Sequence, residues 1–499
     1  MTTTDRPNVL FVVLDTVRKD RLTVYGHDRP TTPTLAAFAE EARVYEQTVA
    51  PAPWTLPVHA SLFTGLYPSE HGATQENPYL EGATTLASTL SAAGYATSCY
   101  SSNAWITPYT RLTEGFDDQD NFFRIMPGGA LSGPLARVWK ALNDSERLRG
   151  LADSVVAVGN AVHERLASGE TEDSKTPAVV DRTVEFVDAA ADRGEPFFSF
   201  INLMDAHHPY HPPGEYAEEF APGVDSTEVS QNATAFNCGA DEIDDGEWES
   251  IRGLYDAEIR HMDDQLDRLF SYLREAGLWE ETMVVVCADH GEMHGEHDLY
   301  GHEFNIYEQL VNVPLLVNHP DMEPGREERQ VELQDLYHTL LDATGVESQG
   351  VELDPRRSLL RDVHRDLADF PGGGEYAFVE YHRPLVELNQ LESIAESAGI
   401  DLDEHSRFYS RMRAARRPDA KYIRNERITD EAYRLDHDPG ELADVAGDSD
   451  GAVEETEVAL AAFEERVGGE WDEVGDDGDV LDGMGAEAKD RLRDLGYVE

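Results

Sequence analysis

Residues 8–15 read NVLFVVLD: an asparagine, an unbroken apolar run and a terminal carboxylate. A strand with one solvent-exposed face alternates polar and apolar residues. An unbroken apolar run therefore predicts a central strand buried on both faces of a parallel sheet. Residues 197–203 (FFSFINL) and 283–288 (MVVVCA) have the same character. The second of these runs also ends at an aspartate, Asp289.

Helical patterns alternate with such runs along the chain. We expect helices over 35–42, 84–93, 255–276 and 333–344, and further strands over 95–100 and 313–317. This alternation predicts an α/β fold, with a large, mainly parallel sheet sandwiched between helices. Ligands bind at the carboxyl ends of strands in such sheets, which makes Asp15 and Asp289 candidate site residues.

The character of the sequence changes after residue 374. Residues 1–374 are expected to form an N-terminal domain with variable inserts at about 121–177 and 221–247, the latter interpreted as an acidic surface loop. Short strand patterns at 376–381, 420–425 and 431–435 predict a smaller C-terminal α+β subdomain, largely antiparallel, over 375–460. Residues 461–499 are acidic and rich in glycine, and a partly flexible tail is expected there.

The charge balance excludes some functions. The chain has 99 acidic and 40 basic residues, a net charge of -59, which argues against a nucleic-acid surface. The acidic residues are spread over the whole chain, which favours adaptation to high salt over one acidic patch for a basic partner. The three cysteines are few and far apart, so neither a disulfide framework nor a zinc motif is expected. No stretch has the pattern of a signal peptide or a membrane span, so a cytoplasmic protein without a membrane partner is expected.

Two of the expected strands end at residue types that can bind metal ions. Asp289 and His290 are adjacent metal-type ligands, and Gly291 after them is expected to permit a sharp turn. A buried carboxylate at Asp15 needs a partner, and a metal ion can be that partner. The alternative is that each carboxylate only caps the turn after its strand.

Residues 52–65 (APWTLPVHASLFTG) place a hydroxyl near a helix start. Thr55 precedes Pro57, as in the first turn of a helix, where an anion is favoured. The alternative is an ordinary threonine N-cap. His207 and His302 belong to histidine-dense segments that predict a polar, metal- or anion-binding pocket.

These segments, in this order, resemble the sulfatase family of the alkaline phosphatase superfamily. The matching blocks are 6–10, 14–15, 25–26, 30–35, 62–68, 71–72, 255–267, 277–279, 289–292, 295–297, 313–315, 435–441 and 495–497. The resemblance implies that residues 1–374 are a catalytic domain. It further implies a small anionic ester as substrate and one divalent metal ion, Ca²⁺, Mn²⁺ or Mg²⁺.

The departures from the family pattern bear on mechanism. Sulfatases carry Cys or Ser, oxidised to formylglycine, at the head of a Cys/Ser-x-Pro-x-Arg motif, and here Thr55, Pro57 and His59 stand at the matching positions. Oxidation of a threonine gives a ketone, so no formylglycine is expected. Thr16 replaces the second aspartate of the family's N-terminal pair, and His302 replaces a lysine.

Threonine nucleophiles occur elsewhere in this superfamily, in nucleotide phosphodiesterases and in membrane-anchored phosphoglycerol and phosphoethanolamine transferases. By this resemblance Asp15, Thr55, Asp289 and His290 are the expected metal ligands. Thr55, His207, His302 and His59 are the expected catalytic residues. Thr55 is then a metal-activated nucleophile, His207 matches the histidine of the family's His-x-Pro motif, and His59 and His302 supply the missing cations when protonated.

Three functions follow as hypotheses. Mechanism favours a phosphoester hydrolase of phosphodiesterase or phosphonate type. The alternatives are a sulfuric ester hydrolase without formylglycine, and a catalytically silent relative that binds an anion or a partner. The chain most resembles a haloarchaeal-type sulfatase-like protein with Thr55 at the formylglycine position.

The charge of -59 generates a stability prediction. Self-repulsion should destabilise the compact state in dilute buffer, and salt should screen it, because the Debye length falls from about 10 Å at 0.1 M to about 3 Å at 1 M. The melting temperature should therefore rise with KCl concentration up to the molar range. A melting temperature that stays constant across that range would contradict the prediction.

Overall fold

The computed structural model describes residues 6–75, 77–122, 174–361, 376–468 and 471. Its main sheet has eight strands in the order β10-β2-β9-β6-β1-β5-β3-β4. The strands are β1 Asn8–Leu14, β2 Arg43–Val49, β3 Ala96–Ser101, β4 Asp118–Asn121, β5 Phe197–Leu203, β6 Thr282–Ala288, β9 Asn312–Asn318 and β10 Gly325–Glu332. β9 runs antiparallel to both β6 and β2, and the other pairs are parallel. The predicted fold class is confirmed.

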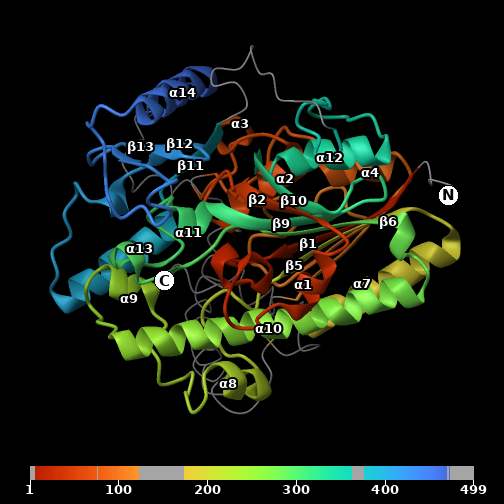
Figure 1. Cartoon of the computed structure of the whole chain (residues 1–499), viewed down its shortest axis with the longest axis horizontal. Coiled ribbons are helices and arrows are strands. Elements are labelled where there is room, and N and C mark those ends of the chain that lie inside the picture. Colours follow the sequence, from red (N-terminus) through yellow and green to blue (C-terminus); the bar gives the residue numbers. More distant parts are fainter. Residues whose placement is uncertain (1–5, 76, 123–173, 362–375, 469–470, 472–499) are drawn as a thin grey trace, which may run out of the picture.

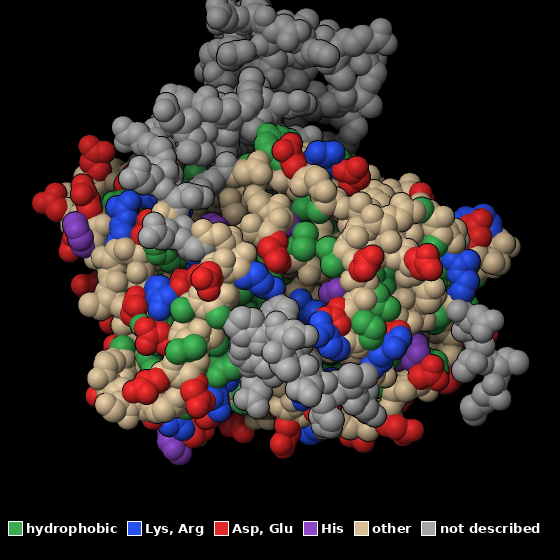
Figure 2. Space-filling model, turned by 90° about the horizontal axis from the view of Figure 1, so that it is seen from above, with side chains coloured by type: hydrophobic (Ala, Val, Ile, Leu, Met, Phe, Trp, Pro, Cys, Tyr) green, Lys and Arg blue, Asp and Glu red, His purple; other side chains and the backbone are tan. Residues whose placement is uncertain are grey.

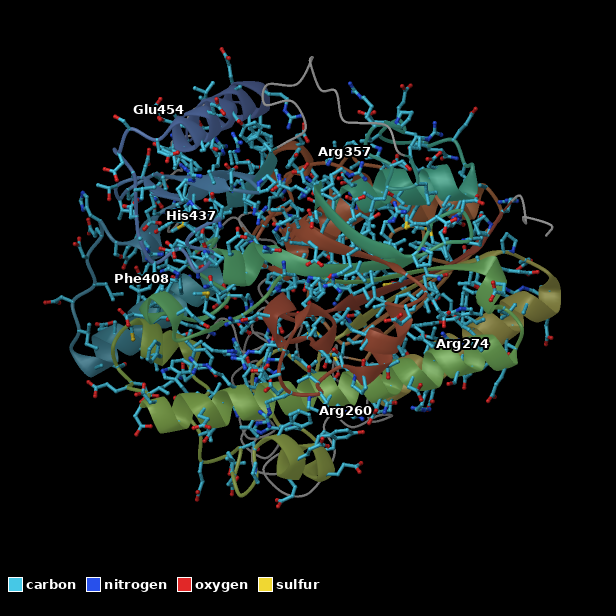
Figure 3. The ribbon with its side chains drawn as sticks, viewed as in Figure 1. Arg260, Arg274, Arg357, Phe408, His437 and Glu454 are labelled. Carbon is cyan, nitrogen blue, oxygen red and sulfur yellow. The ribbon has the colours of Figure 1, made fainter. Side chains whose placement is uncertain are left out.

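Helices cover both faces of this sheet (Figure 1). One layer holds α1 Pro33–Phe38, α7 Thr176–Arg193 and α10 Asp245–Glu275, and the other holds α2 Thr55–Thr64, α4 Leu86–Ala92 and α12 Asp335–Thr344. Sandwiched in this way, β5 and β6 are buried along their whole length, as their apolar runs predict. The apolar stripe of α10 is buried, whereas Arg260 is partly exposed and Arg274 is exposed; Figure 3 labels both on this helix.

A smaller antiparallel sheet follows in the C-terminal part. It has the order β11-β12-β13-β14, with β11 Ala377–Tyr381, β12 Met412–Arg417, β13 Ala420–Asn425 and β14 Glu431–Tyr433. Two helices accompany it, α13 Leu385–Ala398 and α14 Gly451–Val467. The ring of Phe463 on α14 stacks on Phe378 of β11 at 4.3 Å between centroids. The expected domain boundary at 374 lies outside the described residues.

A buried charge cluster joins this sheet to the main one. Lys421 on β13 is fully buried, and its ammonium group contacts Glu441 at 2.9 Å and Glu308 at 3.4 Å. Arg416 on β12 pairs with the same Glu308 at 2.8 Å. Opposite charges held together in this way satisfy groups that would be costly to bury alone.

The remaining elements are short. They are α3 Pro68–His71, α8 Gly214–Phe220, α9 Ala233–Asn237, α11 Glu308–Val311, the strand pair β7 Met293–His294 and β8 Tyr300–Gly301, and 3₁₀ turns at Lys19–Arg21, Thr23–Tyr25, Trp279–Glu281, Glu296–Asp298 and Arg407–Tyr409.

Three expectations differ from the structure. Residues 221–247 are not one loop: Asn232 caps α9, and Asp244 caps α10, which therefore begins at Asp245 and not at residue 255. Residues 461–467, expected to belong to the tail, are part of α14, and nearly all of the rest of the expected tail lies outside the described residues. Most of the predicted insert at 121–177 lies outside the described residues.

The surface carries its charge in dispersed form. Figure 2 shows Asp and Glu side chains spread over the visible face, with Lys and Arg between them. Among the described helices, none has the length and apolar composition that a bilayer crossing needs.

Candidate active site

Three adjacent strands end at the same edge of the main sheet. Leu14, the last residue of β1, pairs with Leu203 at the end of β5 and with Ala288 at the end of β6. The residues that follow these strands therefore lie close together at this edge. Asp15 and Asp289 come directly after β1 and β6, and the histidine-dense segment at 204–210 follows β5.

Asp15, Asp289 and His290 form a fully buried cluster. One ligand atom from each lies within 4.8 Å of the others. Oδ2 of Asp15 accepts hydrogen bonds from Asn103 and Asn202, whereas its Oδ1 has no hydrogen-bond partner, and neither has Oδ2 of Asp289. Burial and the nearby Asp15 raise the pKa of Asp289 well above its usual range. Two buried carboxylates with an unpartnered oxygen each fit a cation.

The imidazole of His290 is also oriented so that it can bind a cation. Its Nδ1 donates to the carbonyl oxygen of Gly291 at 3.0 Å, which leaves Nε2 without a proton and directed toward the cluster. Burial and the neighbouring His302 lower the pKa of His290, so the ring is neutral. A neutral imidazole with an exposed lone pair is a metal ligand. Three oxygen donors and one nitrogen, counting the Thr55 hydroxyl, suit Mn²⁺, Mg²⁺ or Ca²⁺.

Thr55 is the first residue of α2 and reaches this cluster. Its Oγ1 lies 3.4 Å from Nε2 of His290 and accepts a hydrogen bond from Nδ2 of Asn103 at 3.2 Å. The cap position of α2 belongs to Trp54, which makes no side-chain cap hydrogen bond. The threonine hydroxyl thus contacts His290 of the cluster and Asn103.

The residues beside the candidate metal ligands act differently from expectation. Gly291 has no positive φ, and a Cβ at this position would lie 2.0 Å from the carbonyl oxygen of Gln309. The glycine is thus required by close backbone approach and not by a sharp turn. Thr16 donates its hydroxyl hydrogen to the carbonyl oxygen of Asp15, and its backbone N–H donates to Asp289.

His59 lies beneath the cluster, one helical turn after Thr55. Its Nδ1 donates to the carbonyl oxygen of Thr55 at 2.9 Å, and its ring packs edge-on against Phe63 and Phe200. Burial lowers the pKa of His59 to about 4, although Asp15 acts in the opposite direction. The expected positive charge on His59 is therefore absent near neutral pH.

His302 stands between two carboxylates. Its Nδ1 contacts Oε1 of the buried Glu292 at 3.1 Å, and its Nε2 lies 3.5 Å from Oε1 of Glu303. Burial alone would lower its pKa, but Glu303 and Glu292 outweigh burial and raise the pKa to about 10. The rings of His207 and His290 lie 5.2 and 4.6 Å from that of His302, centroid to centroid.

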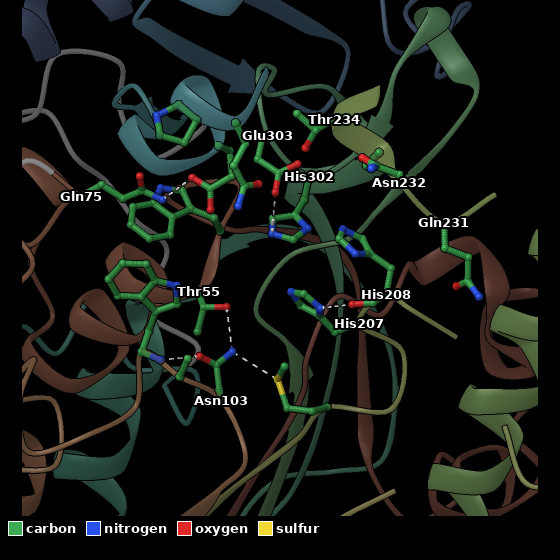
Figure 4. Close-up of a pocket in the computed structure, with 18 of the residues that line it drawn as sticks. Thr55, Gln75, Asn103, His207, His208, Gln231, Asn232, Thr234, His302 and Glu303 are labelled. Atoms are coloured by element: carbon green, nitrogen blue, oxygen red, sulfur yellow. Dashed lines mark hydrogen bonds and ion pairs between the residues drawn. The ribbon is translucent and has the colours of Figure 1, made fainter. Parts of the chain in front are cut away.

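A cavity of about 550 Å³ opens above these groups. Figure 4 shows Thr55 and Asn103 on one side of it, with His207, His208 and His302 across from them. The C-terminal part contributes Tyr381, Pro384, Glu387 and Gln390, so the cavity lies between the two sheets. Among the described residues that line the cavity there is no lysine or arginine, but there are two glutamates.

The structure thus brings together all the site residues selected from the sequence. It adds the amides Asn103 and Asn202, which hold Asp15, and Glu292, which holds His302. Asn103 follows β3 by two residues, so the rule that ligands bind at strand ends could have selected it. Asn202 could have been noticed only as a polar residue within a mostly apolar strand, which is a weaker indication of function.

A mainly parallel, helix-flanked sheet with a buried acidic and histidine cluster at its strand ends defines an α/β protein with a candidate cation site. The chain belongs to the sulfatase family, whose model matches residues 7–346. It is 25% identical over 464 residues to an uncharacterised sulfatase, YidJ, of Escherichia coli K12, covering 89% of this chain and 84% of that protein. It is also 24% identical over 494 residues to a choline-sulfatase of Rhizobium meliloti, covering 94% of this chain and 88% of that protein.

A solved structure gives the same fold. The phosphonate monoester hydrolase of Agrobacterium radiobacter superposes with a TM-score of 0.63 at 20% identity, covering 93% of this chain and 95% of that chain. The chain is therefore a member of a family of ester hydrolases that includes sulfatases, and it has the fold of a phosphonate monoester hydrolase.

The close approach at Gly291 generates a prediction. Gly291→Ala forces a methyl group against the Gln309 carbonyl and should displace the Asp289-His290 turn, which costs roughly 1–3 kcal/mol of unfolding free energy. Mn²⁺ binding should weaken in parallel. Thermal unfolding and Mn²⁺ titration measure both effects.

The control is Gly214→Ala at the start of α8, where a Cβ meets no atom within 4 Å. That change should stay within about 0.5 kcal/mol. If both variants had the same stability and the same Mn²⁺ affinity, the close contact between Gly291 and the Gln309 carbonyl would not be what positions Asp289 and His290.

Proposed function

We propose that this protein is a metal-dependent hydrolase of a phosphate or phosphonate ester, with Thr55 as its nucleophile. The observation that carries the proposal is the position of the Thr55 hydroxyl, at the first residue of α2 and 3.4 Å from Nε2 of His290. We assign the cation to Asp15, Thr55, Asp289 and His290. A divalent cation there lowers the pKa of a coordinated hydroxyl and offsets negative charge on the ester.

The protein groups around Thr55 each have a role in this proposal. Asn103 donates to Oγ1 and stabilises negative charge on it as the hydroxyl proton leaves for solvent. Oγ1 then bonds to phosphorus while the ester bond to the leaving group breaks. The N-terminus of α2 presents the positive end of the helix dipole to the anion. Water releases the product from Thr55 in a second step.

The histidines complete the site. Nδ1 of His207 donates to the carbonyl oxygen of His208 at 2.7 Å, which directs Nε2 away from the backbone. We assign His207, when protonated on both ring nitrogens, the transfer of its Nε2 proton to the leaving oxygen, a contribution of roughly 10²–10⁴-fold. We assign His302 to the non-bridging oxygens, and His59 a positioning role, because its hydrogen bond holds the carbonyl oxygen of Thr55.

A sulfate ester is the second candidate substrate. The family and the sulfatases among the relatives favour it, whereas a threonine at the formylglycine position favours phosphorus. A screen of aryl sulfate, phosphate monoester, phosphate diester and phosphonate substrates with several divalent metals in high salt distinguishes the two. No turnover of any of them would favour the catalytically silent relative.

The decisive variants concern Thr55. Thr55→Ala should lower kcat by more than about 10³-fold with the fold intact, and Thr55→Ser should retain part of the activity, because a primary hydroxyl can attack in the same way. Steady-state kinetics and thermal unfolding are the measurements.

Thr64→Ala is the matched control, because Thr64 is a buried threonine at the other end of the same helix, and its hydroxyl bonds only to backbone groups there, those of Ala60 and Leu66. It should keep its activity. If Thr55→Ala also kept full activity and lost only about 1 kcal/mol of stability, Thr55 would be a structural residue and not the nucleophile.

A further inference from the structure

The segment that carries His207 is held near both of its ends by one helix. This segment joins β5 to α8 and contains no helix or strand, so contacts with other elements fix its backbone. Near its start, Nδ1 of His261 on α10 donates to Oδ1 of Asp205 at 2.7 Å. Further along, Oε1 of Glu258, also on α10, accepts the backbone N–H of His211 at 2.7 Å. His207 lies between these two contacts along the chain.

Asp205 uses both of its carboxylate oxygens. Its Oδ2 accepts the hydroxyl hydrogen of Thr176, the first residue of α7. The side chain of Asp205 is 2% exposed and that of His261 is 7% exposed. Breaking either hydrogen bond would leave a buried polar group unsatisfied, which is costly. Ligand atoms of Asp205, Glu258 and His261 lie within 4.8 Å of one another, as in a metal site, but these contacts are better explained as holding the segment.

The same helix holds the segments after two other strands, through contacts at every third residue from 252 to 261. Arg252 donates to the carbonyl oxygen of His294 at 2.6 Å, in β7, which follows the end of β6. The hydroxyl of Tyr255 donates to the carbonyl oxygen of Thr16 at 2.7 Å, directly after β1. The next two positions make the contacts after β5 described above. The order β6, β1, β5 is also the order of these strands in the sheet, so α10 holds the strand ends that carry the site one after another.

We propose that Asp205 and His261 are positioning residues, which hold His207 so that its Nε2 faces the leaving oxygen of the ester. The backbone N–H of His207 donates to the carbonyl oxygen of Met204 at 3.0 Å, so Asp205 lies inside the turn that ends at His207. A displacement of Asp205 therefore displaces the imidazole. The proposal rests on the proposed function, in which His207 donates a proton to that oxygen.

This role predicts a loss of rate that depends on the leaving group. A proton donor is needed most where the leaving oxygen is strongly basic, as in an alkoxide, and least for 4-nitrophenolate, which departs as an anion. Proton transfer requires the two heavy atoms to lie about 2.6–3.2 Å apart, so a displaced His207 loses its benefit for the alkoxide alone. A purely structural role of Asp205 would instead lower both rates equally.

The test uses the full chain with Mn²⁺ in molar KCl and two substrates, the 4-nitrophenyl and the benzyl monoester of phenylphosphonic acid. Asp205→Ala and His261→Phe should each lower kcat/KM for the benzyl ester by about 10²-fold, the effect of a displacement of about 1 Å, and leave that for the 4-nitrophenyl ester within about threefold. Asp205→Asn can keep both hydrogen bonds, because its amide oxygen accepts from His261 and its amide nitrogen donates to the Thr176 hydroxyl. This conservative variant should retain most of the rate for the benzyl ester.

The matched control is Asp264→Ala. Asp264 follows His261 on α10 by three residues, but it accepts the hydroxyl hydrogen of Tyr216 on α8 at 2.9 Å and pairs with Arg260 of its own helix. This change should leave the rates for both esters unchanged. Thermal unfolding checks that each variant is folded at the assay temperature, and if Asp205→Ala is not, His261→Phe alone decides.

Equal losses for both esters in Asp205→Ala and His261→Phe, or unchanged rates in both variants, would overturn the proposal. His207→Gln separates it from the proposed function. If His207→Gln lowers the rate for the benzyl ester alone and the other two variants do not, the positioning role is refuted and the proton donor stands. If His207→Gln lowers both rates equally or neither, His207 is not the proton donor and both assignments are refuted. Failure of the unmodified protein to hydrolyse either ester would refute the proposed function and, with it, this role.

Discussion

The central constraint in this structure is the burial of two carboxylates side by side. β1 and β6 run in parallel register and end together, so Asp15 and Asp289 are placed within 4.8 Å of each other with no exposure to solvent. At that distance two like charges repel by roughly 3–4 kcal/mol, even at an effective dielectric constant of 20. Two carboxylates buried this close together are stable only if other groups offset their repulsion. The surrounding hydrogen-bond donors do so in part.

The need to offset these two buried carboxylates explains why hydrogen-bond donors surround them. Asn103 and Asn202 donate to one oxygen of Asp15, and the backbone N–H groups of Thr16 and His290 donate to one oxygen of Asp289. One oxygen of each carboxylate remains without a hydrogen-bond partner. A cation that binds these two oxygens stabilises the folded protein through its own binding energy, so metal affinity and stability are linked. The Thr55 hydroxyl contacts His290, which belongs to the same cluster.

The sequence predicts the centre of the sheet better than its edges. β1 and β5 have the bounds expected from their residues, because a strand buried on both faces is largely apolar. Both β2 and β10 were missed: β2 mixes charged and polar residues with its apolar ones, and the edge strand β10 begins with charged, exposed residues that resemble a loop. Asp15 and Asp289 follow from strand ends alone. The charge state of His59 could not be predicted, because it depends on the packing of Phe63 and Phe200 around the ring.

The account's central claim is that Thr55 itself bonds to the transferred group. Rapid quenching of the protein during turnover of a phosphate diester or phosphonate, followed by mass spectrometry of the peptide that contains Thr55, tests this most directly. The account predicts an unoxidised threonine that carries the phosphoryl or phosphonyl group in quenched samples and no modification in samples without substrate. An active protein whose Thr55 never carries the group, with water as the attacking species, would contradict it.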